Sequence, residues 1–244
     1  MTANFRRYLL GWGQVESTKG ELDHYRSGID ASTFNGVVRT RSLDTFADTV
    51  AFARARMAGV PWLWWVGPDS PKGTSDALTA LGSVQVATMP LMVRSLASKL
   101  DDEESTAGLR VEIVEEQSRL VEFIDVYRTS MGLSPEKTAD LARIEAQRSD
   151  NADIVRVAAI SDGTVVGTTE VITAHEVAGL FIVHVAESHR RRGVGGALTA
   201  AALRIGQERG MKQAALIASP AGAPLYRRHS FAPVAEYRLH TFPV

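Results

Sequence analysis

The chain has 244 residues, 45% of them hydrophobic and 23% charged, which is typical of a globular protein with one large domain or two small ones. Its formal net charge of −1 excludes an overall electrostatic match to nucleic acid, so any basic function must be local. The absence of cysteine excludes disulfides, cysteine metal ligands and a cysteine acyl-enzyme.

The apolar stretches are too short for a membrane protein. None approaches the roughly 20 residues that a membrane span needs, and the first ten residues lack the apolar run of a signal peptide. The run at 60–66 holds three tryptophans beside Pro61 and ends shortly before Pro68, which favours a buried strand. We therefore expect no membrane attachment, and the absence of cysteine fits the cytoplasmic location that we predict. Because no histidine and carboxylate have a metal-ligand spacing, we predict no metal.

The N-terminal part has the pattern of an α/β unit. Its predicted elements are a strand at 34–40, a helix at 43–57, a strand at 61–66, a helix at 76–81 and a strand at 84–93. The acidic, polar stretch at 98–108 lacks periodicity and suits a solvated connector. We predict a boundary near residue 105 and domains at 1–105 and 106–244. A surface loop within one domain is the alternative.

The C-terminal part also alternates strands with helices. Ser134 and Pro135 form a helix start, with serine as N-cap and proline at the first helical position. Asp162 and Gly163 predict a tight turn between two strands. The apolar run at 179–185 predicts a central strand. In chain order, the predicted elements are a strand at 109–114, helices at 118–129 and 135–148, strands at 154–160, 165–173 and 179–185, a helix at 194–209, a strand at 214–218, a helix at 223–229 and a final extended segment.

The segment His-Arg-Arg-Arg-Gly-Val-Gly-Gly, from His189 to Gly196, lies between the central strand and a helix. The first turn of a helix has unpaired backbone N–H groups and the positive end of the helix dipole. Glycine permits close backbone approach, and the three arginines add positive donors. This combination predicts a binding site for a di-anionic pyrophosphate.

The loop alone leaves the ligand open. The dinucleotide fingerprint expects a third glycine at position 198, which is leucine here, and the Gly-Lys-Ser/Thr of the Walker pattern is missing. A basic helix start on the surface would have the same residues. Nucleic-acid binding is poorly supported, because one basic loop in a chain of balanced charge is a small footprint.

The surrounding sequence points to one family. The segment 180–198, with a strand that ends in valine followed by Arg190-x-x-Gly193-x-Gly195, resembles the acetyl-CoA motif of the GCN5-related N-acetyltransferase (GNAT) family. Downstream, residues 225–231 resemble the family ending Leu-Tyr-x-x-x-Gly-Phe, with Ser230 in place of its glycine. Two further departures are Glu187, where the family often has proline, and 219–222, where it often has asparagine.

The resemblance covers about residues 109–242 and implies a mixed-sheet α/β (α+β) fold, the acyl-CoA N-acyltransferase (GNAT) fold. It implies acetyl-CoA as the acyl donor. The loop would hold the pyrophosphate through backbone amides, and two valines of the preceding strand would bond the pantetheine arm. The amide of Val185 would also polarise the thioester carbonyl, as an oxyanion donor. The donor-binding residues expected are Val183, Val185, Arg190, Arg191, Arg192, Gly193, Val194, Gly195 and Gly196.

Three residues are candidates for proton transfer. Tyr226 occupies the general-acid position of the family, and a phenol of pKa about 10 can protonate or hydrogen-bond a departing thiolate. A packed tyrosine is the alternative. For the base we expect either Glu170, in a Thr-rich strand, or His184, whose side chain points opposite to those of its valine neighbours. Either side chain could instead be a satisfied residue of the core.

The first hundred residues carry a fainter resemblance. The run from Pro61 to Pro68, then Leu78-x-x-Leu81-Gly82 and the strand at 89–93, resemble the end of a degenerate acetyltransferase half without a cofactor loop. An unrelated α/β extension is the alternative. We predict an acetyl-CoA-dependent N-acetyltransferase that acts on a small-molecule or peptide amine, as a monomer or homodimer. The alternative is an acetyl-CoA-binding regulatory module or pseudoenzyme without acceptor turnover.

Overall fold

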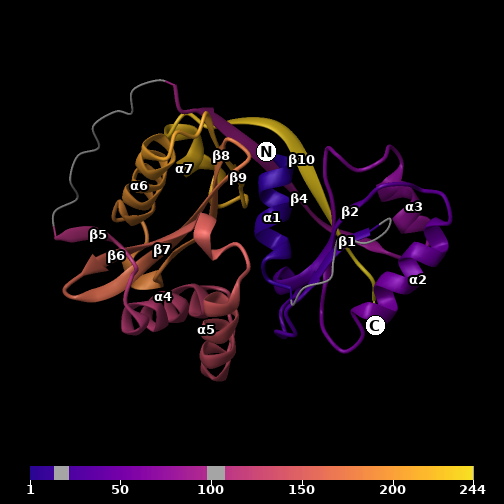
Figure 1. Cartoon of the computed structure of the whole chain (residues 1–244), viewed down its shortest axis with the longest axis horizontal. Coiled ribbons are helices and arrows are strands. Elements are labelled where there is room, and N and C mark those ends of the chain that lie inside the picture. Colours follow the sequence, from indigo (N-terminus) through magenta and orange to yellow (C-terminus); the bar gives the residue numbers. More distant parts are fainter. Residues whose placement is uncertain (14–21, 98–107, 244) are drawn as a thin grey trace. The chain divides into compact units, whose positions relative to one another are not determined.

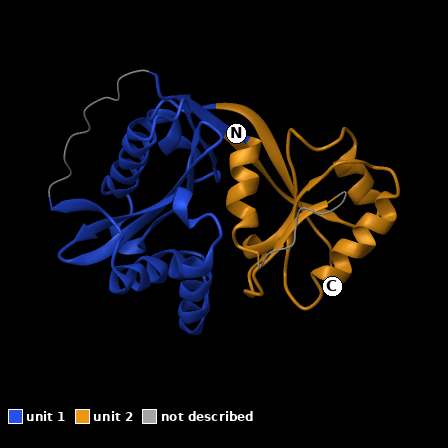
Figure 2. Ribbon diagram, in the orientation of Figure 1, with its two compact units in different colours: residues 1, 92–232 blue, residues 2–91, 233–244 orange. Residues whose placement is uncertain are grey.

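The computed structural model describes residues 1–13, 22–97 and 108–243. Within these ranges, no helix is long and apolar enough to cross a membrane. The chain forms two compact units (Figure 2). The N-terminal unit comprises residues 2–91 and 233–244, and the C-terminal unit comprises Met1 and residues 92–232.

The N-terminal unit is a sheet flanked by short helices. Its strands follow the order β1-β2-β3-β10-β4. β1 and β2 are antiparallel, β2 and β3 parallel, and β3 and β10 antiparallel. The elements are α1 (Thr2–Leu10), β1 (Leu22–Arg26), β2 (Asn35–Thr40), α2 (Phe46–Arg56), β3 (Leu63–Val66), α3 (Thr74–Ala80), β4 (Val84–Ser95) and β10 (Ala232–Thr241).

The tryptophan-rich run is a buried strand, as predicted. In β3, Trp64 is fully buried and packs against Phe46 of α2 at 5.6 Å between ring centroids. Trp62, just before β3, stacks on Phe242 at 5.4 Å. Aromatic rings in such arrangements contribute both buried area and specific geometry. The core of this unit therefore includes a residue from the end of the chain.

β10 completes the N-terminal unit, although it follows the whole C-terminal unit in sequence. It pairs with β3, with Leu239 opposite Trp65. His240 is buried, and its two ring nitrogens lie 3.2 Å from the hydroxyl of Ser75 and 3.1 Å from that of Ser83. These serines lie at the start of α3 and just after its end, so one strand residue ties down both ends of that helix.

The two units therefore share strands along the chain. The division falls within β4, between Leu91 and Met92, and within β10, between Ala232 and Pro233. The predicted boundary near residue 105 lies outside the described residues.

The C-terminal unit is a mixed sheet with helices on both faces. Its strands follow the order β4-β9-β8-β7-β6-β5, in which β5 to β8 are antiparallel and β8 and β9 are parallel. Helix α6 packs on one face and α4 on the other (Figure 1). The elements are β5 (Leu109–Ile113), α4 (Gln117–Ser130), α5 (Thr138–Gln147), β6 (Ile154–Ser161), β7 (Thr164–Ala174), β8 (Val177–Val185), α6 (Val194–Glu208), β9 (Gln213–Ile217) and α7 (Ala223–Arg228).

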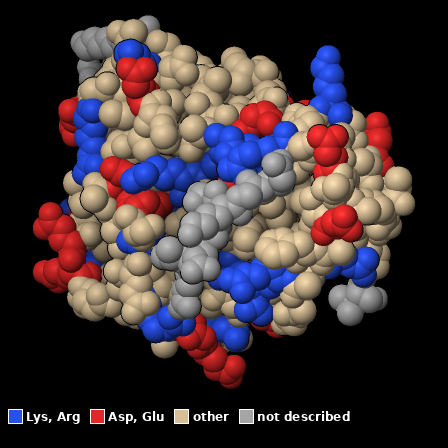
Figure 3. Space-filling model, turned by 45° about the vertical axis from the view of Figure 1, so that its right-hand side comes forward, with Lys and Arg blue, Asp and Glu red and all other residues tan. Residues whose placement is uncertain are grey.

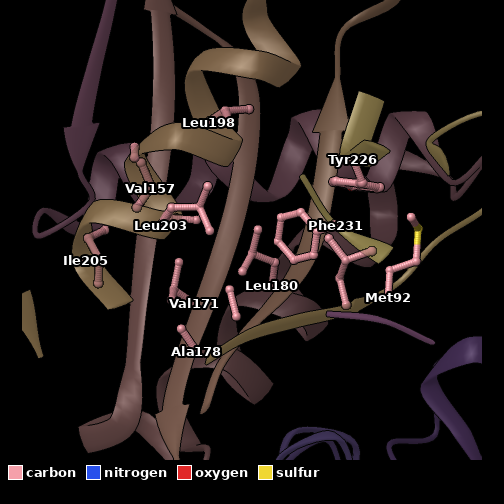
Figure 4. Close-up of a cluster of buried hydrophobic side chains, with 14 of the residues drawn as sticks. Met92, Val157, Val171, Ala178, Leu180, Leu198, Leu203, Ile205, Tyr226 and Phe231 are labelled. Carbon is pink, nitrogen blue, oxygen red and sulfur yellow. The ribbon is translucent and has the colours of Figure 1, made fainter. Parts of the chain in front are cut away.

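The mixed α/β fold is thus confirmed, and local details follow the sequence closely. Asp162 and Gly163 have φ of 48° and 78°, as the predicted tight turn between β6 and β7 requires. The helix expected from Pro135 starts as a 3-10 turn, and the Ser134 side chain makes no capping hydrogen bond. A cluster of apolar side chains from β6 to β8, α6 and α7 fills the space beneath α6 (Figure 4). This core fixes the first turn of α6 against the sheet.

Candidate active site

The two parallel strands of the C-terminal unit separate after a short paired stretch. β8 and β9 pair only from Val177 opposite Gln213 to Gly179 opposite Ala215, although both strands continue. Beyond that point the β9-facing backbone edge of β8 has no strand partner in the described chain. Backbone N–H and C=O groups left in this way must be satisfied by water or by a ligand. The gap can therefore receive an extended molecule as an additional strand.

A β-bulge lies in β8 within this gap. The pairing with β7 shifts between Thr168, opposite His184, and Glu170, opposite Phe181. Ile182 in the bulge has φ of 50°, which is unfavourable for a β-branched residue. The hydroxyls of Thr168 and Thr169 donate to the carbonyls of Ile182 and Phe181, at 2.8 and 3.2 Å. The Thr-rich segment of β7 thus binds the strained backbone, and such bulges often re-aim groups beside active sites.

The arginine–glycine loop ends at the N-cap of α6. Gly193 occupies the cap with φ of 83°, and Arg191 is also left-handed, at 62°. The first hydrogen bond of the helix runs from the Ala197 N–H to the Gly193 carbonyl, at 3.0 Å. Within the described ranges, the N–H groups from 191 to 196 donate no hydrogen bond. Such N–H groups and the helix dipole can bind an anion.

Two glycines let the start of α6 sit close to its neighbours. A Cβ added to Gly195 would lie 3.1 Å from Leu225 Cδ2 of α7 and 3.9 Å from Val185 Cγ2 of β8. A Cβ added to Gly167 of β7 would lie only 2.7 Å from Val194 Cγ1. These contacts bring the start of α6 together with the end of β8 and the start of α7. The close approach at Gly167 was not identified from the sequence.

The loop arginines are exposed. The Arg190 Nε donates to the Val185 carbonyl at 3.3 Å, whereas neither Arg191 nor Arg192 forms an ion pair with a described acidic residue. On the face drawn in Figure 3, basic side chains occur in several small groups with acidic ones between them. The loop thus offers a local concentration of positive charge to an anion.

Tyr226 of α7 lies in the same region. Its side chain is buried against the apolar cluster, with its ring 5.9 Å from that of Phe231 (Figure 4). Burial raises the pKa of Tyr226 to about 12. In the described part of the chain, its hydroxyl has no hydrogen-bond partner. The phenol is therefore protonated at neutral pH and can donate a hydrogen bond.

His184 points to the opposite face of the sheet from Val183 and Val185, as the strand geometry predicted. The two valines pack on the apolar cluster, whereas His184 Nδ1 lies 2.9 Å from Ser130 Oγ of α4. Burial, together with the charge of Arg190, lowers the pKa of His184 to about 4. The ring is therefore neutral at physiological pH. Ser130 was not identified from the sequence, since nothing local marks it.

Glu170 lies in a separate, closed network. It is fully buried, and its carboxylate is 3.0 Å from Arg156 Nε. Arg156 also contacts buried Glu145 at 2.5 Å, and the Tyr127 hydroxyl donates to Glu145 at 3.3 Å. Burial, with the nearby charge of Glu170, raises the pKa of Glu145 to about 7. Two carboxylates thus share one guanidinium, away from the loop. No cluster of metal-ligating residues occurs among the described residues.

The comparisons with known proteins agree with this geometry. Residues 120–231 match the profile of the acetyltransferase (GNAT) family. No curated protein sequence matches the chain. Among solved structures, a GCN5-related N-acetyltransferase from Kribbella flavida has 21% identity and a TM-score of 0.73, and the match covers 100% of this chain and 96% of that one.

Two further structures share the fold over most of the chain. A GCN5-related N-acetyltransferase from Sphaerobacter thermophilus has 17% identity and a TM-score of 0.69, over 90% of this chain and 75% of that one. A tandem GNAT protein from the clavulanic acid biosynthesis pathway has 13% identity and a TM-score of 0.59, over 98% and 94%. The separated strands, the bulge and the glycine loop lie within the stretch that matches the family profile, and residues 120–231 are a domain of the acetyltransferase (GNAT) family.

Proposed function

We propose that the protein is an acetyl-CoA-dependent N-acetyltransferase that moves the acetyl group directly to a primary amine in a ternary complex. The observation that carries this proposal is the convergence of the gap between β8 and β9, the open N–H groups of the loop and Tyr226 at one end of the sheet. A small-molecule or peptide amine is the acceptor.

The donor would lie along β8. The amides of residues 191–196 would hold the pyrophosphate, with Arg190 to Arg192 adding positive charge. The backbones of Val183 and Val185 would bond the pantetheine arm as an added strand. The amide of Val185 would stabilise the oxyanion that forms when the amine attacks the thioester carbonyl.

Tyr226 would act on the leaving thiolate mainly as a hydrogen-bond donor. The thiol formed has a reference pKa of about 8.5, well below the value of about 12 for Tyr226. Full proton transfer from the phenol is therefore uphill, whereas a hydrogen bond to the developing charge is favourable. The final proton of the thiol would come from solvent or from the protonated base.

For the base, the geometry favours His184 over Glu170. His184 is neutral at physiological pH and lies on β8 beside the gap. Glu170 is fully buried, and the guanidinium of Arg156 already compensates its charge. Abstraction of a proton from the acceptor by Glu170 would require the buried ion pair to rearrange. His184 would need no such rearrangement, and because its pKa of about 4 makes it a weak base, it would pass the ammonium proton on to water rather than keep it.

The N-terminal unit would be a degenerate second half. The order β2-α2-β3-α3-β4 repeats the order β8-α6-β9-α7-β10, and each repeat begins with two parallel strands joined through a helix. At the N-cap of α2, Thr45 has φ of 52° in the place that Gly193 takes before α6. The loop from Arg41 to Thr45 has no glycine, and Arg41 is paired with Asp23. These features support a half that binds no donor.

Turnover of acetyl-CoA against a panel of primary amines, read by mass spectrometry of the acetylated product, tests the proposal. Tyr226→Phe should slow turnover, and Tyr237→Phe is a matched control, because Tyr237 is a buried tyrosine of the N-terminal unit. Tight binding of acetyl-CoA without turnover of any amine would instead support a regulatory module. Absence of acetyl-CoA binding would refute both readings.

A further inference from the structure

Ser130 and His184 form an isolated polar pair between α4 and β8. The serine is the last residue of α4, and its Oγ lies 2.9 Å from His184 Nδ1. In the described part of the chain, neither side chain has another hydrogen-bond partner. The ring nitrogen Nε2 of His184 is therefore left for solvent or substrate, and Ser130 is the side chain that bonds Nδ1.

The direction of this hydrogen bond follows from the end of the helix. The carboxyl end of a helix carries partial negative charge, so it attracts a donor such as a ring N–H more than a lone pair. This charge favours donation from His184 Nδ1–H to Ser130 Oγ.

We infer that Ser130 is a positioning residue that accepts the Nδ1–H of His184 and holds the ring in the tautomer whose Nε2 lone pair is open. This inference rests on the proposed function, in which Nε2 removes the proton of the acceptor ammonium. The N–H···O bond also fixes the plane of the ring, so the lone pair keeps one direction relative to β8.

The groups around His184 keep its ring neutral. The charged group that acts on His184 is Arg190, which disfavours the imidazolium, as does burial. Across β7 the ring's partner in register is Thr168, whose hydroxyl is engaged with the Ile182 carbonyl. Glu170 is paired with Arg156. The ring is thus neutral, and the serine selects between its two neutral forms.

Nitrogen NMR of the full chain, with ¹⁵N-labelled histidine, tests the inference without any turnover. The signals of His184 are identified by their loss in His184→Gln. At pH 7 we expect the Nδ1–H tautomer in the wild type, a shift toward Nε2–H in Ser130→Ala, and the wild-type pattern in Ser130→Thr. An Nε2–H tautomer in the wild type, or no change in Ser130→Ala, would overturn the inference whether or not the protein acetylates an amine.

Kinetics then test the role of the tautomer. Ser130→Ala should lower kcat by about tenfold, less than the loss from removing a general base altogether, and leave the KM for acetyl-CoA unchanged. Ser130→Thr should recover most of kcat because it restores the acceptor oxygen. Equal losses in both variants, or an increase in the KM for acetyl-CoA, would show that Ser130 only supports the fold.

Discussion

Gly167 allows α6 to approach β7, and substituting it should disturb the donor site. In Gly167→Ala, the new Cβ would lie 2.7 Å from Val194 Cγ1, 2.9 Å from Leu198 Cδ1 and 3.3 Å from the His184 carbonyl oxygen. Ordinary carbon contacts lie at about 3.5–4.0 Å. The first turn of α6 must therefore move away from the sheet by roughly an ångström. The loop amides before that turn would move with it.

The cost can be bounded from the packing. Overpacking by one methyl group in a close-packed core costs about 1–3 kcal/mol. For a chain of this size, such a loss should lower Tm by about 2–12 °C. Because the displaced residues adjoin the loop, the Kd for coenzyme A should also rise several-fold. Urea unfolding followed by circular dichroism gives the free energy of unfolding, and isothermal titration calorimetry gives the Kd for coenzyme A.

Gly206→Ala is the matched control. It places a Cβ 2.8 Å from Ala178 Cβ and 2.9 Å from Leu96 Cδ1, at the far end of the same helix. Its stability should fall less, because alanine gains about 1 kcal/mol of helix propensity over glycine. Its affinity for coenzyme A should not change. If Gly167→Ala bound coenzyme A as tightly as the wild type, or if Gly206→Ala weakened binding equally, the position of the first turn of α6 would not control the donor site.

Three further predictions concern single residues. Tyr226→Phe should lower kcat by about tenfold or more with little change in the KM for acetyl-CoA, since the hydroxyl acts only as the thiolate forms; an unchanged kcat in a thiol-release assay would exclude that role. The pKa of Glu145 is raised from 4.5 to about 7, so the contribution of Glu145 to stability should be full below pH 4.5 and decline as pH rises through 7. The Tm of the wild type and of Glu145→Gln, measured over that pH range, tests this dependence, and parallel curves would contradict it. Ser230 has φ of 59°, so Ser230→Gly should raise Tm by relieving roughly 1 kcal/mol of left-handed strain, whereas Ser188→Gly, at a residue outside the left-handed set, should not; a lower Tm in Ser230→Gly would refute the assignment of strain.

The sequence predicts the C-terminal unit well because its signals are local. The periodicity at 154–160 and 179–185, the turn at Asp162 and the glycine before α6 each act within a few residues of the chain. By contrast, α1 and β1 were missed, because short elements of this kind derive their stability from packing. The position of β10 in the N-terminal unit depends on pairing with β3, which no local pattern encodes.

The residues of the candidate site also differ in whether a local sequence pattern marks them. The loop and Tyr226 were identified because the residues themselves form a motif, whereas Ser130 and Gly167 matter only through contacts made across the fold. Arg156 is a single charged residue in an apolar strand, and its sequence does not reveal that it neutralises carboxylates from α5 and β7. The sequence therefore leaves Glu170 and His184 as alternatives for the base, and the contacts that they make across the fold favour His184.

The late position of β10 in the chain has a consequence for biosynthesis. The ribosome releases β1 to β3 early, but their sheet lacks β10 until the entire C-terminal unit has been translated. During that interval the edge of β3 is open, and Trp62 lacks the ring of Phe242. An open strand edge is a template for pairing with other chains. Until β10 is made, the nascent N-terminal unit thus exposes a strand edge and an apolar ring that the finished protein covers.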